Sequence, residues 1–172
     1  MASPPAVLAL LARQDGLITV GQAAESGVPE RTLRGWTRDG WRRPAPRVYL
    51  DSRRRLTDRV RIRAAGLWAG DRGTVSGPAA AWWQGMLAAA PARITVTVPR
   101  RLGLRGYPGV QVRGRDLALA DRRRVDGIWC TAAPLTVLET AIALPDGSAF
   151  LDRALQKHVW FNAALLAAAA SA

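Results

Sequence analysis

The stretch that decides the fold of this 172-residue chain is TVGQAAESGVPERTLRGWTRDGWRRPAPRVYL, residues 19–50. Thr19 and Gln22 have the spacing of a capping box, in which two side chains satisfy backbone N–H groups at the start of a helix. This spacing predicts a short helix that begins at Thr19 and ends near Gly27. Pro29 suits the first turn of the next helix, because an N–H at that position would have no partner.

The helix that follows Pro29 is expected to run to Asp39, with Gly40 as the residue after its end, and Glu30 suits the positive end of its dipole. A short helix, a turn containing glycine and a second helix are typical of a helix-turn-helix. Two short β-prone segments around a proline-rich turn follow, which predicts a hairpin. A hairpin directly after a recognition helix is a wing. Residues 1–53 are therefore predicted to form a winged helix-turn-helix DNA-binding domain.

Residues 54–172 are predicted to form a second domain of small, mixed α and β structure, so the fold class is α+β. Residues 56–69 have helical periodicity, with Arg59 and Arg63 on a shared exposed face. Residues 93–98 alternate strictly between polar and apolar, which predicts a half-buried strand. Further helices are expected after Ser76, after Thr131 with Leu135, Leu138 and Ile142 on one face, and after Gly147.

Positive charge is concentrated in two blocks of the chain. Lys and Arg number 25 against 13 Asp and Glu, a net charge of +12. Residues 31–63 hold twelve arginines and three acids, and residues 93–124 hold nine arginines and two acids. A surface that is charged only for solubility would be more evenly mixed, so the blocks favour a polyanionic partner. The second block fits an extended DNA footprint, an RNA or protein partner, or a solvated loop.

The first block supplies the candidate DNA-binding residues. Arg31, Arg34 and Arg38 fall at i, i+3 and i+7 on the predicted recognition helix and share one face. The planar guanidinium of arginine pairs with O6 and N7 of guanine, and Thr32 suits a thymine methyl or a phosphate. Wing side chains are expected to meet phosphates or the minor groove: Arg42, Arg43, Arg47 and Tyr49. The alternative is that the helix arginines form only a solvated face.

The composition gives little support to an enzyme. One cysteine excludes an internal disulfide and a cysteine zinc site, and one histidine disfavours a catalytic triad. His158 has no Ser or Asp motif beside it, Cys130 is expected in the core, and the aspartates at 116, 121 and 126 lack metal-ligand spacing. We expect no catalytic residue, metal or cofactor. No targeting or membrane-spanning segment is recognised, so a cytoplasmic protein is expected.

A series of short motifs extends in order from about residue 6 to residue 157. Its members include GLIT (16–19), RTLR (31–34), GWRR (40–43), VYL (48–50), ITVTVPRR (94–101), GVQV (109–112) and VDGI (125–128). The series resembles the AbiEi-type antitoxin family of type IV toxin–antitoxin systems, in the version common in actinobacteria. The resemblance implies a winged helix that binds inverted repeats at the promoter of its own operon. It also implies an α+β region tied to antitoxin activity, and a nucleotidyltransferase-like toxin as partner.

The sequence departs from this family in two places. Some relatives continue into a domain resembling very-short-patch-repair endonucleases, whereas this chain stops earlier with an alanine-rich end after Phe161, which suggests a truncated C-terminus. Arg47 stands where the family tends to have glycine, so the wing is expected to be looser or differently aimed. The sequence favours a DNA-binding autorepressor of antitoxin type. The alternatives are a fragment of a repair-endonuclease-like protein and a protein-interaction module without specific DNA binding.

Overall fold

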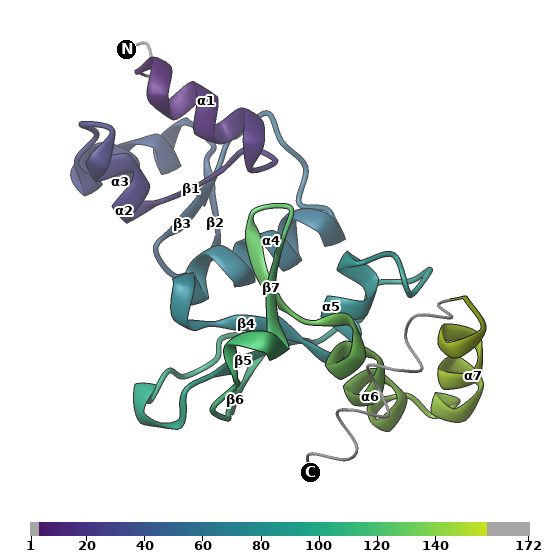
Figure 1. The fold of residues 1–172 in the computed structure, drawn as a ribbon. Helices are drawn as coiled ribbons and strands as arrows, with labels where there is room; N and C mark the ends of the chain where they lie inside the picture. Colours follow the sequence, from purple (N-terminus) through teal and green to yellow (C-terminus); the bar gives the residue numbers. More distant parts are fainter. Residues whose placement is uncertain (1–3, 158–172) are drawn as a thin grey trace. The chain divides into compact units, whose positions relative to one another are not determined.

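The computed structural model describes residues 4–157, which divide into two compact units after Gly70 (Figure 1). The boundary expected after residue 53 falls later, because helix α4 (Asp58–Ala69) contacts the strands of the first unit. Each unit contains both helices and strands, so the predicted α+β class is confirmed. Within the described residues, no helix is long and apolar enough to cross a membrane.

The first unit has the element order of a winged helix-turn-helix. Before α4 it contains α1 (Pro5–Arg13), β1 (Leu17–Thr19), α2 (Val20–Glu25), α3 (Glu30–Trp36), β2 (Arg42–Ala45) and β3 (Val48–Leu50). The three strands form an antiparallel sheet in the order β1-β3-β2, in which Ile18 pairs with Tyr49. Strand β1 contacts α1 and α2, and β2 and β3 form the wing that the sequence predicts.

The predicted capping box fixes the start of α2. The Gln22 N–H donates to Thr19 Oγ1 at 3.1 Å, and the Thr19 N–H donates to Gln22 Oε1 at 3.1 Å. The Gln22 side chain also exchanges two hydrogen bonds with the Gln14 amide, at 3.0 and 2.9 Å. This amide pair joins the chain just after α1 to the first turn of α2.

The core of the first unit anchors α3 by one side. Leu33 of α3 is fully buried, and Trp36 packs against the same core with its ring centroid 4.6 Å from that of Trp41. The other buried members come from the surrounding elements: Val7, Leu11, Ile18, Val20, Ala23, Val28 and Tyr49. Because Leu33 and Trp36 face inward, the arginines of α3 remain in solvent.

One arginine of α4 departs from the prediction. Arg63, expected on an exposed face, is buried, and its Nε donates to Asp15 Oδ2 at 2.7 Å. Arg59 Nε lies 3.2 Å from the same oxygen. The prediction is wrong because helical periodicity cannot show a counter-charge 48 residues away that makes arginine burial favourable. The ion pair ties α4 to the turn after α1.

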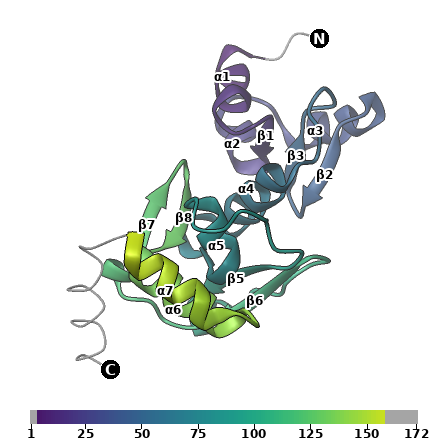
Figure 2. The same ribbon diagram turned by 90° about the vertical axis from the view of Figure 1, so that its right-hand side faces the viewer.

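The second unit is built on a five-stranded mixed sheet in the order β6-β5-β4-β8-β7 (Figure 2). Its strands are β4 (Thr74–Ser76), β5 (Ile94–Val98), β6 (Val110–Gly114), β7 (Arg122–Val125) and β8 (Ile128–Thr131). Its helices are α5 (Gly77–Trp83), α6 (Ala133–Ala143) and α7 (Gly147–Lys157). The predicted Asp126-Gly127 turn joins β7 to β8 with φ values of 47° and 84°, which a two-residue hairpin turn of type I′ requires.

Strand β5 is buried throughout rather than half-buried. Its threonines bond to neighbouring strands: Thr97 Oγ1 lies 2.9 Å from Ser76 Oγ, and Gln111 Nε2 donates to Thr95 Oγ1 at 2.6 Å. The alternation of polar and apolar residues correctly indicates a strand here, but it predicts that the threonine face is exposed to solvent. That face is buried instead, because its threonine hydroxyls bond to side chains of the neighbouring strands.

The three apolar residues expected on one face of helix α6 do not form its buried face. Ile142 is 86% exposed, and Leu135 and Leu138 are half-buried. The buried face contains Val137 together with Thr136 and Thr140, whose hydroxyls bond to backbone carbonyls. Those hydrogen bonds offset the desolvation cost of burying the threonine hydroxyls. Hydropathy alone does not predict such bonds.

Candidate nucleic-acid interface

The predicted base-reading residues lie on and just beyond α3. Arg31 and Arg34 are exposed on the helix, and Thr32 is half-buried near its start. The helix ends at Trp36, earlier than predicted, and the chain continues as a 3-10 turn over Thr37–Asp39 that holds exposed Arg38. Gly40 follows with φ of 86°, the left-handed conformation expected after a helix end.

The wing exposes two arginines on β2. Arg42 and Arg43 are both exposed. Arg42 Nη2 donates to the Arg54 carbonyl, which attaches the strand to the loop after the wing. The Arg43 guanidinium carbon lies 5.5 Å from the centre of the Tyr49 ring, within the range of a cation–π contact. Arg42 is thus oriented by the loop after the wing, and Arg43 by the hairpin itself.

The wing turn is tight, which contradicts the expectation of a looser hairpin. Ala45 pairs with Val48, so only Pro46 and Arg47 form the turn. Arg47 takes φ of 58°, the left-handed conformation that favours glycine, and its carbonyl accepts from the Val20 N–H at 2.9 Å. The arginine therefore holds the glycine conformation while adding a cation at the tip of the wing.

An acidic side chain joins the recognition helix to the wing. Glu30 Oε1 accepts from Arg34 Nη2 at 2.8 Å, and Glu30 Oε2 lies 3.9 Å from Arg47 Nη1. The hydrogen bond from Arg34, helped by the charges of Arg34, Arg47 and Arg43, holds the pKa of Glu30 below its usual value against a smaller opposing effect of desolvation. The pairing with Arg34 was readable from its i,i+4 spacing, whereas the pairing with the wing was not.

One predicted contact residue lies in the core. Tyr49, expected to bond a phosphate, is 1% exposed and packs in the core behind α3. The prediction is wrong because β3 is the central strand of its sheet, and all three of its residues are buried. The structure therefore leaves seven of the eight predicted residues with a side chain that is exposed or half-exposed: Arg31, Thr32, Arg34, Arg38, Arg42, Arg43 and Arg47.

The second basic block is partly paired within its own unit. Arg122 and Arg124 lie over the Trp129 ring at 4.7 and 5.7 Å from its centre, and Asp71 Oδ1 lies 3.3 Å from Arg124 Nη2. On the opposite edge strand and just after it, Arg113 and Arg115 each approach buried Glu139 at 3.4 Å. Burial raises the pKa of Glu139, an effect opposed by the Gly77 N–H and by the two arginines.

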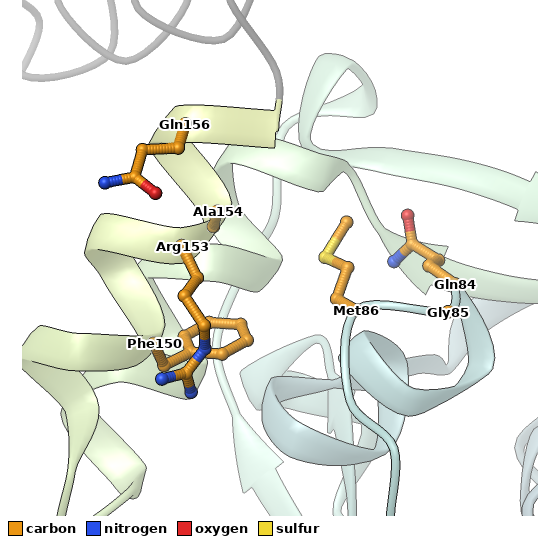
Figure 3. Close-up of a pocket in the computed structure, with 7 residues that line it drawn as sticks. All are labelled: Gln84, Gly85, Met86, Phe150, Arg153, Ala154 and Gln156. Carbon is orange, nitrogen blue, oxygen red and sulfur yellow. The ribbon is translucent and has the colours of Figure 1, made fainter.

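A cavity of about 430 Å³ lies in the second unit beside α7 (Figure 3). Met86 and Phe150 line it with apolar surface, and Arg153 is its one charged side chain among the described lining residues. Those residues include no nucleophile and no acid–base pair. Of the two residues considered as catalytic candidates, Cys130 is fully buried, and His158 lies outside the described residues.

The first unit is thus a winged helix-turn-helix with arginines exposed on α3 and on the wing. No protein-family model matches the chain, and no curated protein matches it. Among solved structures, the chain is similar to the RV2827C protein from Mycobacterium tuberculosis, with 17% sequence identity and a TM-score of 0.46. That match covers 88% of this chain and 70% of the other.

Proposed function

We propose that this protein is a DNA-binding transcriptional regulator of antitoxin type that represses its own toxin–antitoxin operon. One observation carries the DNA-binding part: α3 and the wing tip meet through Glu30, which lies between Arg34 and Arg47. Helix α3 and the wing each expose arginines and are linked by this carboxylate. Such a pair suits DNA, with the helix in the major groove and the hairpin on the adjacent phosphate backbone. The antitoxin part is supported by the resemblance of the ordered motifs.

In this proposal the α3 region reads bases and the wing holds phosphates. Arg31, Arg34 and Arg38 reach base edges, and each good bidentate pair gives about 1–3 kcal/mol of discrimination. Thr32 contacts a thymine methyl or a phosphate near the helix start. Arg42, Arg43 and Arg47 clamp the backbone. Tyr49 acts only through the core, where it packs behind the helix.

The proposed partners follow from the same assignment. The DNA is double-stranded and consists of inverted repeats in the promoter of the operon. A nucleotidyltransferase-like toxin encoded in that operon is the proposed protein partner. The regulator works in the cytoplasm without a catalytic role of its own, and neither a metal nor a cofactor enters the proposal.

A mobility-shift titration tests the proposal, with DNA from upstream of the gene and a scrambled duplex of the same length. Wild-type protein is expected to prefer the upstream DNA, and log K should fall with log salt by about 0.9 per phosphate contacted. The double variant Arg34→Ala/Arg38→Ala should lose that preference while keeping non-specific binding. Arg153→Ala, which removes an exposed arginine of α7, is the control and should keep it. An unchanged preference in the double variant would refute the assignment of the recognition helix.

A further inference from the structure

A small hollow in the second unit is lined by three arginines and two buried threonines: Arg72, Arg115, Arg122, Thr74 and Thr97. It lies where β4 begins and β5 ends, and its volume is about 30 Å³. None of the described residues that line it is acidic. A space of this size admits one or two water-sized groups, so it fits one or two oxygens of a small anion and excludes a nucleobase.

Arg122 lines this hollow and is held in place by three hydrogen bonds. Its Nη2 donates to the Asp71 carbonyl at 2.6 Å and to the Gly73 carbonyl at 3.3 Å, and its Nε donates to Thr74 Oγ1 at 2.7 Å. Desolvation lowers the pKa of Arg122, although the Asp71 charge opposes the effect. A partly dehydrated cation that is held in place is stabilised by an anion beside it.

Thr74 adds a buried hydroxyl group to the lining of the same hollow. Its side chain is almost wholly buried, and its oxygen accepts the bond from Arg122, so the hydroxyl hydrogen is directed elsewhere. Thr97 on the neighbouring strand is equally buried and shares a hydrogen bond with Ser76. An anion in the hollow is an acceptor for the Thr74 hydroxyl, which a second cation cannot be.

Arg72 and Arg115 also line the hollow and are more exposed than Arg122. The backbone of Arg115 is held by its N–H, which donates to the Val98 carbonyl at 2.8 Å. Its guanidinium lies 3.4 Å from Glu139, but Arg113 lies at the same distance from that carboxylate, and the Gly77 N–H also donates to it. Arg115 can therefore turn to an anion without leaving Glu139 unpaired.

We propose that this hollow binds a phosphate group through Arg122, the Thr74 hydroxyl, Arg72 and Arg115. Arginine suits this ligand because its planar donors match phosphate oxygens. The site is separate from the winged helix, and its existence does not depend on sequence-specific DNA binding. The phosphate comes either from a free phosphomonoester or from a nucleic-acid backbone.

Calorimetric titration of the full chain with inorganic phosphate tests the site. Arg72→Ala and Arg115→Ala each remove one charge-assisted hydrogen bond, worth about 1.5–3 kcal/mol, so each should weaken binding about tenfold or more. Arg123→Ala removes an exposed arginine of β7 that does not line the hollow and should change the affinity less than about threefold. Arg122 is left intact because its three bonds support the fold. Equal weakening in all three variants, or no saturable binding by wild type, would overturn the proposal.

Competition experiments then distinguish the two sources of the phosphate. A deoxynucleoside 5′-monophosphate and a single-stranded thymidine octamer without terminal phosphates are each titrated against bound inorganic phosphate. Displacement by the monophosphate alone assigns the site to a phosphomonoester, and displacement by the octamer assigns it to a backbone. The octamer arm is repeated in Arg34→Ala/Arg38→Ala, where displacement should persist. Competition that is unaffected by Arg72→Ala and Arg115→Ala would place the phosphate elsewhere and refute the site.

Discussion

Arg34 donates two hydrogen bonds to Glu30, from Nη2 at 2.8 Å and from Nε at 3.3 Å. Arg34, which we propose reads a base, is therefore already engaged by a carboxylate one turn earlier on α3. The same carboxylate lies within 4 Å of the wing arginine Arg47. In the proposed DNA complex, a duplex would compete with Glu30 for both cations.

Glu30→Gln is expected to strengthen binding to a scrambled duplex by about threefold, because it frees Arg34 and Arg47 from a weak, exposed ion pair. Fluorescence anisotropy at low salt measures the change. Since the pKa of Glu30 is lowered, the pair is intact at neutral pH and is lost only as pH falls through that lowered value, below 4.5. Mild acidification should therefore not reproduce the effect. Glu25→Gln, an exposed acid of α2, is the control, and an equal gain there would show a general charge effect.

Two substitutions of Arg47 should separate charge from backbone strain. Arg47→Ala and Arg47→Gly both remove the wing cation and should weaken DNA binding equally. Only glycine adopts the left-handed φ of 58° without strain. The free energy of unfolding of the Arg47→Gly variant should therefore exceed that of the Arg47→Ala variant by about 1 kcal/mol. Urea denaturation and anisotropy on the same two preparations give both quantities. Equal stability of the two variants would contradict a strained turn.

Asp15→Asn should lower the free energy of unfolding by about 2 kcal/mol, because it replaces the carboxylate that buried Arg63 Nε bonds at 2.7 Å with a neutral amide. Asparagine is chosen because it tolerates the positive φ of Asp15 better than most residues. Asp58→Asn is the matched comparison, since Asp58 pairs with Arg61 at 2.6 Å on the exposed surface and should cost less than about 1 kcal/mol. Similar losses from both substitutions would mean that burial of Arg63 adds nothing.

Cys130 should resist alkylation in the native protein and react fully after denaturation. Burial raises the pKa of its thiol to about 12, although the charge of Arg123 opposes the shift slightly. Above pH 9 an unfolded thiol releases its proton while the native one keeps it, so native stability should fall as pH rises from 9 towards 12. A Cys130→Ala variant should lose this slope relative to wild type in denaturation experiments between pH 8 and 10. Rapid native labelling near pH 8 would contradict the buried thiol.

Local signals predicted the first unit well because its fold depends on residues close in sequence. The capping box at Thr19 and the left-handed Gly40 lie where the sequence places them. The hairpin after α3 also forms, with Arg47 in the left-handed conformation that favours glycine. Each of these features is fixed within a few residues, so pattern and turn chemistry suffice.

Predictions that depended on distant partners failed. Arg63 is buried because of Asp15, and the burial of Tyr49 follows from the central position of its strand. The three-residue strand β4 carries no periodicity of its own and lies between β5 and β8 in the sheet. Within the candidate interface, the arginines were readable from helical spacing, whereas the contact between Glu30 and the wing required coordinates.

The paired amides of Gln14 and Gln22 hold α1 against α2 without any net charge. Mobile ions weaken contacts between exposed charges but have little effect on a neutral pair. Concentrated salt should therefore dissociate the proposed DNA complex while the hydrogen bonds between Gln14 and Gln22 remain intact. Material eluted from a heparin column by a steep salt gradient should emerge natively folded, so salt-induced release reports dissociation rather than melting.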